Sequence, residues 1–424
     1  MNMRSKAVKA MGIVAIGSVV ALTLAGCSRG GDAGGGDDGK GGDSGAPAAS
    51  PGITDDAITL GVTTPLSGAT AGPGNCTVAG LVAYFGQAGP IEFGDGKTRE
   101  VTVEAFDDAY DPQKALSNFQ QNQSNVFAFT SGLGTPTNRA YREAAIEEEV
   151  PQALVMTGDP LFSDRTESPW QLGFVPIYQN EGAAFGELLA SSEEDHKVAI
   201  LFQNDDYGKG YVEGFKSAIE GADNIEVVKE LSYEATDTAV DAQLTELAAS
   251  GADVFFNAMS ITPLAIASIE KARELSWTPS WFLPSNTSSP GAILTPAAAN
   301  AEDGFYSVSF AKAPQSPAFA EDEDVKGFLA ALEEFSGDYT TKPDFPHCMW
   351  SYMVGATLEE AFKGMTEPTR ENFMKSLTDI SDFTAPLMLE GTSIDTTKDG
   401  QPAVASVVVQ RFNGKGYENA ESFD

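Results

Sequence analysis

Apolar and polar residues follow two alternating patterns along this chain. Short, largely apolar runs typical of buried strands occupy residues 58–64, 101–106, 126–130, 153–156, 197–203, 253–257 and 280–284. Between them, apolar residues recur at helical spacing in 113–121, 137–149, 181–191, 211–219, 239–250 and 263–275. This alternation of strands and helices predicts parallel sheets covered by helices and joined by right-handed crossovers.

The alternation falls into two sets. One set ends at about residue 175 and the second begins at about residue 180, with a strand-like piece carrying Pro176 between them. The chain has 424 residues, roughly twice the size of a common single domain. We therefore expect an α/β protein with two lobes, each built on its own parallel sheet.

The N-terminal segment has the layout of an export signal. Residues 1–10 carry three basic residues and no acid, and residues 11–24 form an apolar run. The run is too short for a spanning helix, which needs about 20 apolar residues. It ends in LAGC at 24–27, which resembles the lipobox of bacterial lipoproteins and implies cleavage after residue 26 and lipidation of Cys27. The alternative is an ordinary cleavage site followed by an incidental cysteine.

A linker is predicted after Cys27. Residues 28–51 contain nine glycines among Asp, Ser, Ala and Pro, so they cannot bury enough apolar surface to offset the entropy of ordering. We take 27–52 as the lipidated cysteine and a flexible tether, with a reach of roughly 25 to 30 Å as a random coil. The lipid and the tether together predict a protein anchored on the extracytoplasmic face of the cell membrane.

The charge of the chain excludes some partners. Asp and Glu number 61 against 26 Lys and Arg, for a net charge of −35. Such a charge repels nucleic acid phosphates, so no nucleic acid partner is expected. His196 and His347 are the only histidines, which excludes a histidine-rich metal site. No nucleotide, zinc or serine-hydrolase motif is present, so we expect no cofactor, no metal and no catalytic residue.

Five motifs in order carry a resemblance to a known family. They are PLSG at 65–68, DDAYDP at 107–112, NDDYGKG at 204–210, Tyr233 followed by Asp237, and GADV at 251–254. The chain resembles the leucine/isoleucine/valine-binding-protein family, the type I substrate-binding proteins of ABC importers. This resemblance implies two doubly wound parallel-sheet lobes joined by three crossover hinge segments, which close on a small solute.

The resemblance also implies the lobe boundaries. Residues 53–175 and 312–378 would form the N-terminal lobe, and residues 176–311 and 379–424 the C-terminal lobe. The chain would cross near 306–311 and again near 377–383. The implied function is capture of a small polar solute, such as an amino acid, amide or carboxylate, and its delivery to ABC permease subunits. The alternative is a sensing lipoprotein that signals to a membrane receptor.

The predicted binding site centres on SGLGTPT at 131–137. Glycines there allow a tight turn, and Pro136 suits the first turn of a helix whose N–H groups can bind an anion. The resemblance places the family's carboxylate-binding loop on these residues. The alternative is that Gly134 and Thr135 only end a strand and start a helix. The full predicted set is Ser67, Gly68, Leu133, Gly134, Thr135, Gly158, Asp159, Tyr207, Ser260 and Ser285.

One departure from the family bears on the solute. Amino-acid binders of this type commonly hold the ligand ammonium with an acid in a segment like WFLPSN at 281–286, where this chain has Ser285 or Asn286. A neutral side chain cannot pair with a desolvated ammonium as a carboxylate can. Leaving that charge unpaired would cost several kcal/mol. A carboxylate without an ammonium, a short amide or urea, or an aromatic acid therefore fits these residues no worse than a branched-chain amino acid.

Two further sets of residues invite a structural role. Cys76 and Cys348 are the cysteines left after Cys27, and in an exported protein two such cysteines suggest a disulfide. Asp107, Asp108 and Asp111 invite a calcium site. Their spacing lacks the alternating ligands of a calcium loop, so helix capping before Pro112 is the favoured interpretation.

Overall fold

The computed structural model describes residues 47–299, 304–339 and 345–423. The predicted signal peptide, the lipidation site Cys27 and most of the predicted linker lie outside these residues. Within the described ranges, no helix is both long enough and apolar enough to cross a membrane.

Six described strands form the first sheet, in the order β2-β3-β1-β4-β5-β6. Their bounds are β1 Ala57–Thr64, β2 Ile91–Glu92, β3 Thr98–Asp107, β4 Ala128–Thr130, β5 Gln152–Val155 and β6 Gln171–Gly173. Neighbouring strands pair in parallel except β2, which is antiparallel to β3.

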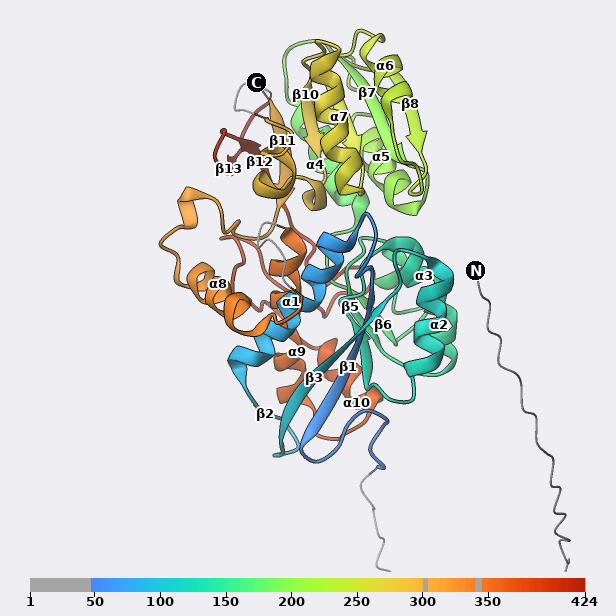
Figure 1. Cartoon of the computed structure of the whole chain (residues 1–424), viewed down its shortest axis with the longest axis vertical. Coiled ribbons are helices and arrows are strands. Elements are labelled where there is room, and N and C mark those ends of the chain that lie inside the picture. The colour runs from blue at the N-terminus through green and yellow to red at the C-terminus, as the bar shows by residue number, and fades with distance from the viewer. Residues whose placement is uncertain (1–46, 300–303, 340–344, 424) are drawn as a thin grey trace, which may run out of the picture. The chain divides into compact units, whose positions relative to one another are not determined.

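Helices cover both faces of this sheet (Figure 1). One face carries α1 (Ala71–Ala88), α8 (Glu323–Phe335), α9 (Pro346–Gly364) and α10 (Arg370–Leu377), and the other carries α2 (Pro112–Asn122) and α3 (Thr135–Glu147). Along β4, Ala128 packs into the first core and Phe129 into the second, because successive residues of a strand face opposite sides.

The second sheet repeats this plan with seven described strands, in the order β13-β12-β11-β10-β9-β7-β8. Their bounds are β7 His196–Gln203, β8 Ile225–Tyr233, β9 Val254–Ala258, β10 Ser280–Leu283, β11 Phe305–Ser309, β12 Val408–Phe412 and β13 Tyr417–Asn419. Helices α4 (Tyr178–Ala190) and α5 (Asp206–Ala218) cover one face, and α6 (Asp241–Ala248) and α7 (Thr262–Glu274) the other. Strands β12 and β13 are antiparallel additions at one edge.

The described chain passes between the two lobes three times. It leaves the first sheet after β6 and enters α4, and it returns after β11, where Phe310 joins the core of the first lobe. Apolar residues between Ala385 and Val404 still pack in that core, and the chain rejoins the second sheet at β12. These contacts favour a last crossing after Val404 rather than near 377–383. The other predicted lobe boundaries stay a prediction.

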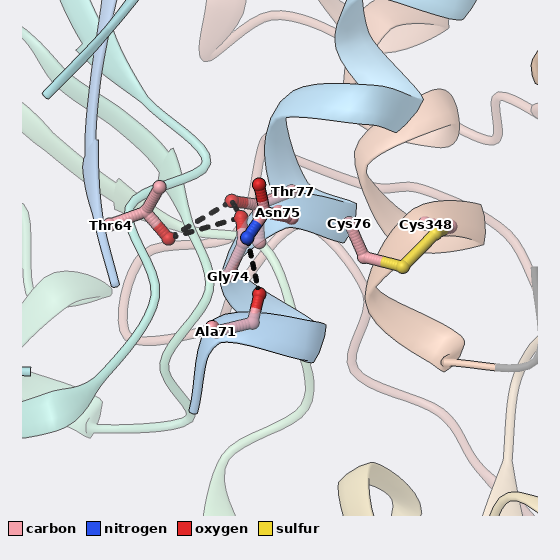
Figure 2. The surroundings of a disulfide bond; sticks show 7 residues. All are labelled: Thr64, Ala71, Gly74, Asn75, Cys76, Thr77 and Cys348. Carbon is pink, nitrogen blue, oxygen red and sulfur yellow. Dashed lines mark hydrogen bonds between the residues drawn. A yellow bond between two sulfur atoms is a disulfide. The ribbon is translucent and has the colours of Figure 1, made fainter. Parts of the chain in front are cut away.

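A disulfide joins α1 to α9 (Figure 2). Cys76 and Cys348 are bonded, with their Cα atoms 4.3 Å apart. The helices approach closely because α1 has a glycine at the crossing: a Cβ atom at Gly80 would lie 2.2 Å from the carbonyl oxygen of Cys348. The hydroxyl group of Thr64, at the end of β1, is hydrogen-bonded to the hydroxyl group of Thr77 in α1, with the two oxygens 3.1 Å apart. The start of α1 is therefore fixed to the sheet on one side and to α9 on the other.

The acidic motif after β3 does cap a helix. Asp111 accepts hydrogen bonds from the backbone N–H groups of Gln113 and Lys114 at the start of α2. Asp107 instead accepts from Leu66 and Ser67 in the turn between β1 and α1. The capping interpretation is thus confirmed for Asp111.

Candidate functional site

Helix α3 begins just beyond the carboxyl end of β4, where the sequence predicts an anion-binding turn. Gly134 precedes the helix with a φ of 110°, a conformation that favours glycine. A Cβ atom there would lie 2.6 Å from the ring of Tyr110, so glycine also lets Tyr110 pack against the turn. Because glycine has no side chain to cap α3, the first N–H groups of the helix are left for other acceptors.

Three hydroxyl groups meet beside this turn. The Thr135 hydroxyl lies 2.9 Å from the Thr157 hydroxyl and 2.9 Å from that of Tyr178, and the last two are 3.0 Å apart. All three side chains are buried, and burial raises the pKa of Tyr178, which keeps it neutral. A ring of three hydroxyls uses each proton once and leaves lone pairs over. It can therefore accept hydrogen bonds from a solute, and it can donate one when a hydroxyl turns its proton out of the ring.

The second lobe brings Tyr207 to the same place. Tyr207 lies in the first turn of α5, and its hydroxyl is 3.0 Å from the carbonyl oxygen of Met259 and 3.0 Å from Oδ1 of Asn286. Its ring meets that of Tyr178 edge to face, with centroids 4.9 Å apart. Tyr211, one turn further along α5, stacks on Tyr178 at 5.0 Å. Tyr178, Tyr207 and Tyr211 thus form an aromatic cluster where the two lobes meet.

Glu181 is a site residue that the sequence analysis missed. It lies in the first turn of α4, is 2% exposed, and accepts hydrogen bonds from the Tyr211 hydroxyl at 2.7 Å, the Ser285 hydroxyl at 2.9 Å and the Ser285 N–H at 3.2 Å. Burial raises the pKa of its carboxyl to about 7, and the hydrogen bonds from Tyr211 and Ser285 oppose that rise. The cleft therefore holds an acid, supplied by α4 rather than by the segment at 281–286.

Helix α9 supplies the other end of the site. His347 and Trp350 lie in its first two turns, with their rings 4.9 Å apart. His347 is 3% exposed, and its Nδ1 has no hydrogen-bond partner among the described residues. Burial lowers the pKa of His347 to about 3, so the imidazole is neutral at physiological pH. Because Cys348 follows His347 directly, the disulfide holds this end of α9 in place.

Apart from Thr157 and Met259, the residues of these contacts around Thr135, Tyr207, Glu181 and His347 line one cavity. The lining residues are Thr70, Pro73, Tyr110, Leu133, Gly134, Thr135, Met156, Val175, Tyr178, Glu181, Tyr207, Tyr211, Ser260, Ser285, Asn286, His347 and Trp350. They come from both lobes, and none of these described residues is Lys or Arg. The cavity measures about 40 Å³. A cavity that holds benzene measures roughly 150 Å³, so any solute of that size requires the lobes to part.

Besides the hydrogen bonds of Tyr178 to Thr135 and Thr157, two further contacts bridge the lobes beside the cavity. Arg139 of α3 pairs with Asp159 of its own lobe and with Asp206 of α5, the latter at 2.6 Å. Tyr110 leaves the first lobe after β3 and packs against the core of the second lobe. These contacts hold the lobes in the arrangement in which the cavity is small.

The predicted site residues fall into two groups. Leu133, Gly134, Thr135, Tyr207, Ser260 and Ser285 line the cavity together. The remaining four lie outside that lining: Ser67 and Gly68 are exposed, with the Ser67 hydroxyl bonded to Asp107 at 2.6 Å; Gly158 packs against Tyr178; and Asp159 pairs with Arg139. The strand ends therefore converge as expected, but the first turn after β1 is used to hold Asp107.

Comparison with known proteins identifies the family. A family model described as a periplasmic binding protein matches residues 57–416. The chain belongs to the periplasmic binding protein family. This binding protein is also similar to "Leu/Ile/Val-binding protein homolog 3" of Brucella melitensis, with 28% identity over 47% of this chain and 53% of the relative. The matched region spans about half the length of that curated relative.

Solved structures agree on the fold of this binding protein. A fatty acid ABC transporter substrate-binding protein from Thermomonospora curvata superposes with a TM-score of 0.72 and 22% identity, covering 88% of this chain and 95% of that one. A solute-binding protein from R. palustris in complex with benzoate gives a TM-score of 0.69 and 17% identity, covering 86% and 95%. The type I periplasmic binding fold and the family resemblance found in the sequence are both confirmed.

Proposed function

We propose that this binding protein is the extracytoplasmic solute-binding lipoprotein of an ABC importer. It captures a small polar solute by hinge closure and delivers it to the permease subunits. The observation that carries the proposal is the shared cavity, in which Thr135 of the first lobe and Tyr207 of the second line one space. A solute that touches both lobes favours the closed form through its differential affinity for the two arrangements.

The hinge mechanism follows from the size of the cavity and the contacts around it. At about 40 Å³ the cavity admits a solute only when the lobes separate. Separation breaks the pair between Arg139 and Asp206 and withdraws Tyr110 from the second lobe. Closure on the solute restores both contacts, and the closed form is what a permease would recognise.

The solute is proposed to be an amino acid, amide or carboxylate-like molecule. The start of α3 offers backbone N–H groups to a carboxylate, and the hydroxyls of Thr135, Tyr178 and Tyr207 can donate or accept. Similar proteins are named for Leu/Ile/Val and for a fatty acid, and one is in complex with benzoate. An acid group common to such solutes suits the N-terminus of α3.

The remaining parts of the proposal rest on the sequence. Cys27 would carry the lipid, Gly-rich residues up to 52 would tether the lobes, and the protein would work at the outer face of the cytoplasmic membrane. Its proposed role is binding rather than catalysis, because the family model that matches the chain describes a periplasmic binding protein.

A solute panel tests the proposal. Thermal unfolding is measured with amino acids, short amides, and aliphatic and aromatic acids, and at least one should raise the melting temperature in a concentration-dependent manner. Thr135→Ala and Tyr207→Ala should weaken that stabilisation, whereas Thr245→Ala on the exposed side of α6 should leave it unchanged. Normal binding by both cleft variants would show that the site lies elsewhere, and no stabiliser in the whole panel would refute the proposed function.

A further inference from the structure

Among the residues that the structure describes, Glu181 has hydrogen-bond donors around it but no counter-charge. Within the described ranges, its two carboxyl oxygens accept hydrogen bonds from Tyr211 and Ser285 alone, and both partners are neutral. None of the described cavity-lining residues is Lys or Arg. A buried carboxylate without a cation is costly, and proteins normally pair such a group or keep it protonated.

The groups that face Glu181 cannot supply a cation themselves. On α5, Tyr207 and Tyr211 have pKa values raised by burial, and they can only be neutral or negative. On η2 (Ser285–Thr287), Ser285 does not titrate. His347, which α9 contributes to the cavity lining, has its pKa lowered by burial and stays neutral. Burial also raises the pKa of the Glu181 carboxyl to about 7, against the lowering effect of the hydrogen bonds from Tyr211 and Ser285.

We propose that Glu181 is the specificity-determining residue of the cleft, and that it selects a solute with a cationic nitrogen, whose charge replaces the proton of the carboxyl group. This inference rests on the proposed function and narrows its solute class. Ser285 stands where the family resemblance leads one to expect the acid, and here it donates two hydrogen bonds that orient Glu181. A carboxylate on the same solute would reach the start of α3, so the favoured solute is dipolar.

The proton balance is simple. In the protein without solute, part of the population carries Glu181 as the neutral acid near pH 7. When an ammonium group binds, the acid loses its proton to solvent and the carboxylate accepts hydrogen bonds from the ammonium. No covalent bond changes. The apparent affinity should therefore rise with pH up to about 7 and then level off, by up to roughly tenfold for each pH unit below that value.

The test uses matched pairs of solutes. Isothermal titration calorimetry compares leucine, phenylalanine and glycine with the α-hydroxy acids in which a hydroxyl replaces the ammonium group. The wild-type protein should bind at least one amino acid on the order of 100-fold more tightly than its hydroxy acid. Glu181→Gln keeps the size of the side chain and should remove that preference and the pH dependence. Glu187→Gln, on the exposed side of the same helix, should keep both.

The outcomes separate this inference from the proposed function. If a hydroxy acid binds as well as its amino acid, or if Glu181→Gln keeps the preference, the inference is overturned while a solute-binding role stands. If no amino acid binds and an amide or simple acid from the wider panel does, the inference is again overturned and the proposed function is upheld. If nothing in either panel binds, both are refuted.

Discussion

Removing the carboxylate that links the lobes should weaken solute binding without unfolding the protein. In Asp206→Asn the side chain keeps its size and loses its charge, so the ion pair with Arg139 across the lobes is broken. Arg139 retains Asp159, a partner of its own lobe. The change therefore acts on the contact between lobes and leaves the first lobe intact.

The structure sets the size of the effect. The Asp206 side chain is 53% exposed and that of Arg139 is 34% exposed, so solvent screens most of the attraction. Pairs of this kind contribute about 0.5 to 1 kcal/mol. Because the pair forms only when the lobes meet, its loss lowers the closed-to-open ratio, and raises the Kd, by about two- to fivefold.

The assay is calorimetric titration of a stabilising solute at low and high salt. Asp206→Asn should raise the Kd at low salt, and the difference from the wild type should shrink as salt screens the pair. Asp55→Asn is the matched control, because Asp55 pairs with Lys97 within one lobe. An unchanged Kd in Asp206→Asn, or an equal rise in the control, would refute the idea that this pair acts on closure.

Three further predictions concern stability. Gly80→Ala should lower the free energy of unfolding by about 2 to 3 kcal/mol, since its Cβ atom would lie 2.2 Å from the Cys348 carbonyl oxygen. Gly327→Ala on α8 should not, because its Cβ atom would meet only Gln87 Nε2, at an ordinary 3.9 Å, among the described residues, and equal urea midpoints for the two variants would contradict this. Replacing Cys76 and Cys348 together by Ala should cost about 3 to 5 kcal/mol, because the bond closes a loop across a separation of 272 residues, and an unchanged urea midpoint would argue against it. For Glu181, the pKa in the folded protein is about 7, above the ordinary 4.5. The protonated carboxyl therefore favours the folded state: its contribution to the free energy of unfolding is fully present below pH 4.5 and is lost as pH rises to about 7. Urea unfolding across this range should show Glu181→Gln gaining about 3 kcal/mol relative to wild type; a constant difference would mean that the carboxyl is not perturbed.

The strands that the sequence predicts correctly are the buried ones, such as 58–64 and 197–203, because parallel strands covered on both faces read as apolar runs. Strand β8 escapes prediction. It pairs only with β7 among the described strands, and its charged Glu226, Lys229 and Glu230 break the apolar run. Helix α1 is also not predicted, but because it has too few polar positions rather than too many. It is buried on most sides between the sheet and α9, and its glycines and Pro73 hide the helical period.

The residues of the site likewise divide into those that the sequence could predict and those that it could not. Thr135 and Tyr207 could be predicted because strand ends and helix starts are recognisable in the sequence, and the family motifs mark them. Glu181 could not, since an acid in the first turn of a helix usually faces solvent and interacts with the helix dipole. Its burial depends on Tyr211 and Ser285, which are 30 and 104 residues away along the chain. Only the folded arrangement of α4, α5 and η2 brings them together.

The central claim is that the two lobes close around a solute held between Thr135 and Tyr207. Small-angle X-ray scattering with and without a stabilising solute tests it most directly, because closure moves whole lobes and changes the radius of gyration. The account predicts that saturating solute lowers the radius of gyration in the wild type and that a Thr135→Ala/Tyr207→Ala double variant shows no change at the same concentration. A solute that binds tightly to the wild type and leaves its radius of gyration unaltered would contradict the claim.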